Sequence, residues 1–129
     1  MTTLSDQIRN CFDGVVHNPY QSKDKRVLFV CSMGILRSAT AARIYARKYN
    51  TRSAGTYPDA LVPLTGLLLE WADQVVFVNE ENYQSTVKKL SQTDFERLSP
   101  KFRVLDIPDQ YEHMDARLID AFEQQYEVL

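Results

Sequence analysis

From Val27 to Ala42 the sequence reads VLFVCSMGILRSATAA. The four apolar residues before Cys31 are typical of a strand that helices cover on both faces of a sheet. From Ser38 onward, apolar residues including Tyr45 and Tyr49 recur at helical spacing in an alanine-rich segment. The loop between Cys31 and Ser38 is therefore predicted to join a strand end to a helix start, where the helix dipole and the loop amides converge.

The same alternation of strand and helix continues to the C-terminus. Further strands are predicted near residues 51–54, 75–78 and 102–107, after the first at 26–31. The helices between them are indicated by apolar faces at Leu64, Leu67, Leu68 and Trp71, then at Tyr83, Val87 and Leu90, and the last begins near Asp115 with Leu118, Ile119, Phe122 and Tyr126. We expect an α/β fold, a single three-layer domain over residues 26–129 with a four-stranded parallel sheet flanked by helices. Residues 1–25 are predicted to form an N-terminal helical extension and linker.

Composition narrows the class of protein. The chain has 129 residues, of which 44% are apolar, and its formal net charge is −2 from 15 basic and 17 acidic residues. One core fits this length, and the charge gives no basic field for nucleic acid or an anionic membrane surface. No apolar stretch approaches the roughly 20 residues needed to span a bilayer, and the N-terminus lacks the form of a signal peptide. We expect a cytoplasmic protein with no nucleic-acid or membrane partner; the sequence does not indicate an oligomeric state.

The two cysteines have different expected roles. With no export signal both are expected to stay reduced, although Cys11 and Cys31 could in principle form one disulfide. Cys11 lies in a helix-spaced apolar pattern with Leu4, Ile8 and Phe12, which favours a small buried hydrophobe. Cys31 stands at the predicted strand end and is the candidate for chemistry.

Cys31 and Arg37 have the spacing of a phosphate-binding thiolate loop. The five intervening residues allow the backbone to curve around an anion, and a guanidinium offers a planar fork for two of its oxygens. Thiols at helix N-termini beside guanidinium groups ionise more readily than free thiols. Ser38 could donate its hydroxyl to the sulfur, cap the helix, or do both. Cys31 is thus a candidate nucleophile and Arg37 a candidate phosphate ligand.

The loop residues between them are expected to act through their backbones. Gly34 is predicted to adopt a positive φ, which glycine allows at little steric cost. Met33, Ile35 and Leu36 add no polar side chain, so they either wall the pocket against water or pack inward. The predicted phosphate-binding loop is Ser32, Met33, Gly34, Ile35 and Leu36.

A carboxylate is expected at the same edge of the sheet. Asp106 and Asp109 follow the fourth predicted strand, and the carboxyl ends of parallel strands meet at one edge. Dephosphorylation by a covalent route needs such an acid for the departing oxygen. Neither His17 nor His113 stands in a metal-like cluster, so no metal or other cofactor is predicted; His113 lies near the acidic segment and could touch substrate.

Four segments in order resemble the low-molecular-weight protein tyrosine phosphatase family, most of all its compact microbial and phage-type members. They are VLFVCSMGILRS (27–38), RSAGT (52–56), WADQVVFV (71–78) and DIPDQY (106–111). The resemblance covers the chain from Arg26 to the C-terminus.

The resemblance implies that Cys31 attacks phosphorus, that Arg37 binds the phosphate and that Asp109 is the general acid, with Asp106 as the alternative. Tyr111 would wall the substrate ring, or is a surface tyrosine. The substrate would be a phosphotyrosine protein or a small phosphomonoester. Some positions depart from the family pattern: Met33 and Gly34 replace a glycine and an asparagine, Leu36 replaces a second cysteine, and Gln110 replaces a proline.

Two other functions remain open. The altered loop could grip phosphate without turning it over, which would make the protein a phosphoprotein-binding module. Related arsenate reductases use the same loop but pass oxidation to cysteines downstream, and this chain has none after Cys31. An external thiol reductant would then be required.

Overall fold

The structure, a computed structural model, describes residues 24–126. Its strands are β1 (Arg26–Cys31), β2 (Asn50–Gly55), β3 (Gln74–Phe77) and β4 (Phe102–Val104). Its helices are α2 (Arg37–Ile44), α3 (Gly66–Trp71), α4 (Glu80–Val87), α5 (Gln92–Leu98), the short 3-10 helix η1 (Ser99–Lys101) and α6 (Ala116–Tyr126). Within these residues, no helix has the length and apolar character that a membrane span needs.

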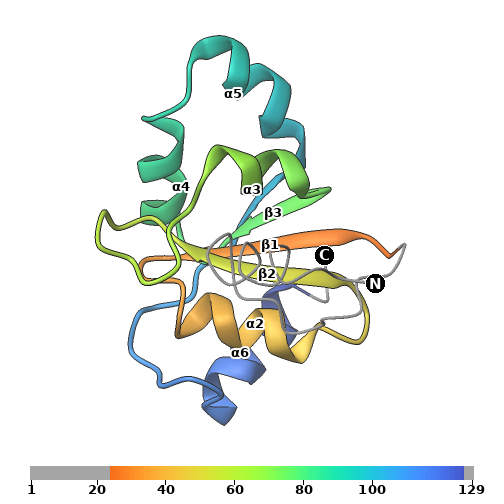
Figure 1. The fold of residues 1–129 in the computed structure, drawn as a ribbon. Helices are drawn as coiled ribbons and strands as arrows, with labels where there is room; N and C mark the ends of the chain where they lie inside the picture. Colours follow the sequence, from red (N-terminus) through yellow and green to blue (C-terminus); the bar gives the residue numbers. More distant parts are fainter. Residues whose placement is uncertain (1–23, 127–129) are drawn as a thin grey trace, which may run out of the picture.

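The four strands form one parallel sheet in the order β2-β1-β3-β4. Helices α2 and α6 cover one face, and α3, α4 and α5 lie over the other (Figure 1). Because both faces are covered, β1 is buried from Val27 to Cys31. Phe29 packs against Tyr45, Phe122 and Tyr126 on the α2–α6 side. The predicted α/β class, with its four-stranded parallel sheet flanked by helices, is confirmed.

Most predicted elements occur within a few residues of their expected bounds. The first strand has the expected limits, β2 extends one residue further than expected at each end, and β3 begins and ends one residue earlier. β4 ends at Val104 rather than Ile107, but the backbone N–H groups of Leu105 and Ile107 still donate to Phe77 and Val78. The polypeptide therefore continues along the sheet towards Asp109.

Three expectations about the helices were wrong. α5 was not predicted; it adds a second helix between β3 and β4 and buries only Leu98. Leu67 was placed on a buried face but is 71% exposed, because the helix begins at Gly66 with Thr65 as its N-cap, and it buries Leu68 and Leu69. Ser38 does not cap α2: the helix begins at Arg37, and Leu36 is the N-cap.

The N-terminal extension over residues 1–25 lies outside the described residues except for Asp24 and Lys25. The predictions for Cys11 and His17 also fall outside them.

Candidate functional site

The loop from β1 to α2 begins with Cys31 at the carboxyl end of the central strand β1. Cys31 is unpaired and only 2% exposed. Its Sγ accepts from the backbone N–H of Gly34 at 3.2 Å and lies 3.0 Å from Oγ of Ser38. Both groups can donate to a thiolate, so the loop provides two hydrogen bonds that favour a negative charge on this sulfur.

The loop backbone also carries unused donors. No acceptor among residues 24–126 bonds to the backbone N–H of Met33, Ile35 or Leu36. These residues follow Cys31 and precede the N-terminus of α2, where the helix dipole is positive. A concave run of free N–H groups at a helix start can bind an anion.

Arg37 is the first residue of α2 and is 1% exposed. Its Nη1 donates to the carbonyl oxygen of Ile107 at 3.0 Å, and its Nη2 donates to Oγ of Ser32 at 3.1 Å. These bonds fix the plane of the guanidinium against two separate segments. Further N–H groups of the same side chain remain for a ligand.

Two glycines allow the loop its path. Gly34 has a φ of +82°, as predicted, and its carbonyl oxygen accepts from Oγ of Ser53 on β2 at 3.3 Å. Gly55, at the end of β2, lies directly against the loop: a Cβ there would meet the carbonyl carbon of Met33 and come within 2.5 Å of the Ser32 oxygen. The loop can pack this closely on β2 only because position 55 has no side chain.

The two aspartates after β4 occupy different places. Asp109 has a carboxylate oxygen 3.7 Å from Nε of Arg37, and its side chain is 59% exposed. The backbone of Asp106 instead bonds with the side-chain amide of Gln125 on α6. Only Asp109 therefore reaches the guanidinium beside the loop.

The segment after Asp109 packs on the α2–α6 face. Tyr111 is half-buried against the core there, and the guanidinium of Arg117 lies 5.4 Å from its ring centroid. Nδ1 of His113 lies 3.3 Å from Oγ1 of Thr40, which also accepts from the backbone N–H of Met114 at 2.8 Å. His113 is exposed.

Sequence reasoning missed one buried residue at this edge of the sheet. Asn82 in α4 is 0% exposed, and its Nδ2 donates to Oγ of Ser32 at 3.4 Å and to Oγ1 of Thr56 at 3.1 Å. A signal was available, because Asn82 follows β3 and the carboxyl ends of parallel strands meet at one edge. That argument was applied only to the acidic residues after β4.

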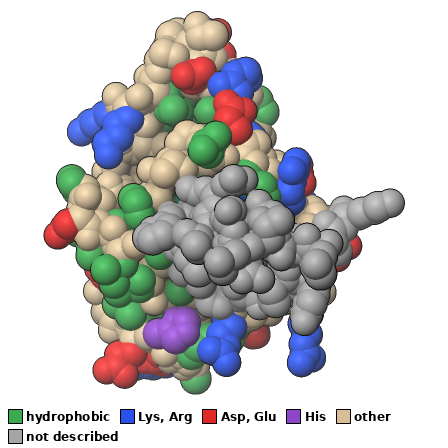
Figure 2. Space-filling view, in the orientation of Figure 1, with side chains coloured by type: hydrophobic (Ala, Val, Ile, Leu, Met, Phe, Trp, Pro, Cys, Tyr) green, Lys and Arg blue, Asp and Glu red, His purple; other side chains and the backbone are tan. Residues whose placement is uncertain are grey.

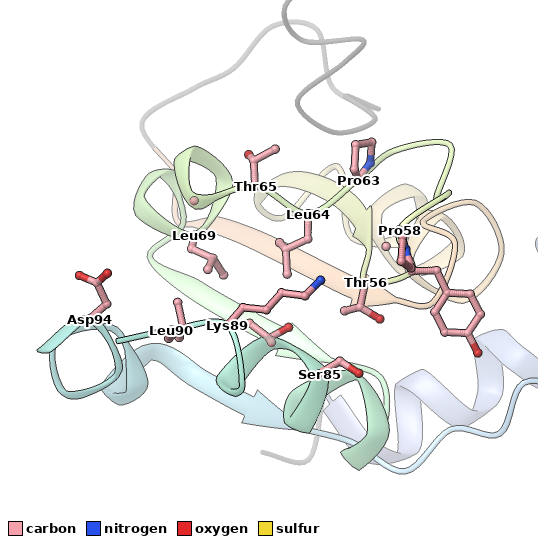
Figure 3. Close-up of a pocket in the computed structure, with 14 residues that line it drawn as sticks. Thr56, Pro58, Pro63, Leu64, Thr65, Leu69, Ser85, Lys89, Leu90 and Asp94 are labelled. Atoms are coloured by element: carbon pink, nitrogen blue, oxygen red, sulfur yellow. The ribbon is translucent and has the colours of Figure 1, made fainter. Parts of the chain in front are cut away.

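A cavity of about 480 Å³ lies between α4 and the segment that joins β2 to α3 (Figure 3). Leu64, Leu69 and Leu90 contribute apolar side chains to the lining, and Lys89 contributes a charged one. Thr56 belongs both to the cavity lining and to the contact with Asn82. Thr56 and Asn82 therefore connect the cavity lining to Ser32 of the Cys31 loop through hydrogen bonds.

Charges on the molecular surface are mixed. On the face drawn in Figure 2, the Lys and Arg side chains drawn in colour lie among Asp and Glu side chains, with no broad area of one sign. The positive charge that matters for an anion is therefore local, at the buried Arg37 guanidinium.

Comparison with known proteins places the fold. No family model matches the sequence, and no curated protein matches it significantly. Two solved structures of the phosphatase YwlE do superpose on the chain. The chain has the fold of the low-molecular-weight protein tyrosine phosphatases.

The first of these structures is a cysteine-to-serine mutant of the YwlE arginine phosphatase with a phosphorylated active-site serine. It is 23% identical, covers 77% of this chain and 84% of its own, and has a TM-score of 0.51. The second is a YwlE mutant from Bacillus subtilis, 22% identical over 78% of this chain and 87% of its own, with a TM-score of 0.53. Likeness at this level of identity concerns the fold.

Proposed function

We propose that the protein is a phosphomonoester hydrolase, and specifically a protein tyrosine phosphatase, that acts through a cysteinyl-phosphate intermediate. The observation that carries the proposal is the arrangement at Cys31. A sulfur with two hydrogen-bond donors lies at the start of a loop with free N–H groups, and a buried guanidinium closes the same loop. These are the groups that a phosphate monoester and a thiolate nucleophile require.

In the first step the Cys31 thiolate attacks phosphorus, and the bond from phosphorus to the leaving oxygen breaks. Arg37 and the loop N–H groups bind the remaining phosphoryl oxygens as charge moves between them. Asp109 donates its proton to the departing oxygen.

In the second step water attacks the phosphorus of cysteinyl phosphate. Asp109, now a carboxylate, removes a proton from that water, and the sulfur–phosphorus bond breaks to release inorganic phosphate and the thiolate. Ser38, 3.0 Å from the sulfur, donates a hydrogen bond to the thiolate as it departs. No cofactor takes part in this sequence.

The residues that follow Asp109 bear on the substrate class. Tyr111 lies two residues after Asp109, which suits a side chain that would flank an aromatic leaving group. The fold is shared with an arginine phosphatase, so a phosphoarginine peptide belongs among the substrates compared. We expect p-nitrophenyl phosphate and a phosphotyrosine peptide to be hydrolysed, and phosphoarginine to be hydrolysed more slowly.

The first test separates turnover from binding. Cys31→Ser should abolish hydrolysis of p-nitrophenyl phosphate but still bind phosphate, because the loop N–H groups and Arg37 remain. Wild-type turnover by Cys31→Ser would refute the covalent route. A wild-type protein that binds phosphate but hydrolyses none of the three substrates would instead support the phosphoprotein-binding module.

The second test assigns the acid with a matched pair of variants. Asp109→Asn should lower kcat by about 10²- to 10⁴-fold, most of all for alkyl phosphates, whose leaving groups need a proton. Asp106→Asn removes the same charge three residues away and should stay near wild type, because its backbone, not its carboxylate, holds Gln125. The reverse pattern would transfer the role to Asp106.

A further inference from the structure

Asn82 contacts the loop from a different element and is absent from the mechanism above. Its side chain is completely buried between Ser32 of the loop and Thr56 after β2. The amide nitrogen has two hydrogens, and these two contacts use both of them. The amide oxygen Oδ1 has no hydrogen-bond partner among the described residues. Burying an unpaired acceptor is costly, so the two bonds from Nδ2 are what hold this side chain in place.

The hydrogen bonds around Ser32 determine the direction of its hydroxyl proton. A serine hydroxyl has one hydrogen to donate and two lone pairs that accept. Nη2 of Arg37 and Nδ2 of Asn82 are donors without any lone pair to offer, so the Ser32 oxygen accepts from both. Both lone pairs are then occupied. The remaining group is the O–H itself, for which residues 24–126 provide no acceptor.

We propose that Asn82 is a positioning residue of the anion site, which acts through Ser32. By occupying one lone pair of the Ser32 oxygen, Asn82 turns the hydroxyl proton away from α4 and towards a phosphoryl oxygen held by Arg37. The Ser32 hydroxyl would thereby become a further donor to the bound anion. This inference rests on the proposed phosphatase function, because it assumes that an anion binds beside Arg37.

The structure supplies a matched control on the same helix. Asn79 is the N-cap of α4, and its Oδ1 accepts from the backbone N–H of Asn82 at 3.0 Å. Asn79→Ala removes an amide three residues away and a helix cap, but within residues 24–126 the Asn79 side chain makes no hydrogen bond to Ser32 or Arg37. It therefore reports the effect of weakening α4 alone.

The experiment measures phosphate affinity and p-nitrophenyl phosphate kinetics for wild type, Asn82→Ala, Asn82→Asp and Asn79→Ala, with thermal unfolding of each. Asn82→Ala should weaken phosphate binding and lower kcat/KM by about 10-fold, the value of one hydrogen bond to a charged group. Asn82→Asp keeps the shape but converts the donor to an acceptor, which draws the Ser32 proton away and adds a negative charge. It should lose more than Asn82→Ala does, while Asn79→Ala stays within about 2-fold of wild type.

A double-mutant cycle tests whether Asn82 acts through Ser32. If it does, Asn82→Ala should have no further effect on phosphate affinity or on kcat/KM in a Ser32→Ala background, a result that simple destabilisation of α4 would not give. Equal losses in both backgrounds would overturn the proposal, as would Asn82→Ala behaving like Asn79→Ala. If Asn82→Ala fails to fold, Asn82→Leu, which has a similar volume, no donor and no charge, decides by the same comparison.

The outcomes also separate this inference from the proposed function. If the wild-type protein binds phosphate but does not hydrolyse its esters, the proposed enzymatic function is refuted. The phosphate affinities of the variants still test the role of Asn82 in that case. If the wild-type protein hydrolyses the esters and Asn82→Ala changes neither phosphate affinity nor kcat/KM, the role of Asn82 is refuted and the proposed phosphatase activity stands. A wild-type protein that neither binds phosphate nor hydrolyses esters refutes both.

Discussion

The close approach of Gly55 to the Cys31 loop leads to a sharp prediction about a residue that carries no functional group. In Gly55→Ala the new Cβ would lie against the carbonyl carbon of Met33, 2.5 Å from the Ser32 oxygen and 2.7 Å from the Gly34 nitrogen. All three atoms belong to the backbone, so no side chain can rotate away. Ordinary contacts begin at about 3.4 Å, so the loop would have to move by about 1 Å relative to β2.

Such a shift would affect function more than stability. The N–H of Gly34 is one of the donors to the sulfur, and displacement of a reacting group by about 1 Å can cost about 10²-fold in rate. We expect Gly55→Ala to lower kcat/KM for p-nitrophenyl phosphate by about 10²-fold. Overpacking a buried contact should lower the free energy of unfolding by about 1–3 kcal/mol, which leaves the variant folded and measurable.

A second glycine provides the control. A Cβ at Gly66, the first residue of α3, would meet no atom within 4 Å. Gly66→Ala should therefore keep wild-type kinetics and be neutral or more stable by up to about 1 kcal/mol. Steady-state kinetics and urea unfolding of both variants give the answer. If Gly55→Ala retained kcat/KM within about 3-fold of wild type, the loop would not be held by its contact with β2, and the reasoning would be refuted.

Three further predictions concern charged side chains. Arg37→Lys keeps the charge, but a lysine cannot donate to the Ile107 and Ser32 oxygens together. Its kcat for p-nitrophenyl phosphate should fall by about 10³-fold or more, and near-normal turnover would contradict the proposed role of Arg37. Nζ of Lys101 donates to two carbonyl oxygens at the end of α3. Lys101→Met should therefore lower the free energy of unfolding, measured in urea, by about 1–2 kcal/mol without changing kcat/KM, and unchanged stability would contradict this role of Lys101. Backbone and side-chain hydrogen bonds from Arg26 hold the pKa of Asp73 below its usual 3.8. The stability that this pair contributes is therefore fully present above pH 3.8 and is lost as pH falls below 3.8 through the lowered pKa of the folded state. Asp73→Asn should then lose less stability than wild type between about pH 5 and pH 3, and the difference should be under about 1 kcal/mol because the pair is exposed. An equal loss of stability in the two proteins on acidification would exclude the effect.

Some helices could not be located from local pattern alone. α5 has Ser91 as its N-cap but buries only Leu98, so its sequence shows no apolar periodicity. The apolar residues of α3 did not fix where this helix begins. Thr65 is the N-cap because its hydroxyl accepts from the N–H of Leu68, and this start turned Leu67 to the solvent.

The sequence by itself determined the parallel sheet, the place of the Cys31 loop at a strand end and the positive φ of Gly34. Those features follow from apolar runs, from helical periodicity and from the spacing between Cys31 and Arg37, all of which act over a few neighbouring residues. Only the tertiary structure decided which distant groups complete the site. The Gly55 contact, the Asn82 amide and the Ile107 carbonyl come from segments 21 to 70 residues away from their partners. Their approach depends on how strands and helices pack together, and local sequence patterns do not record that packing.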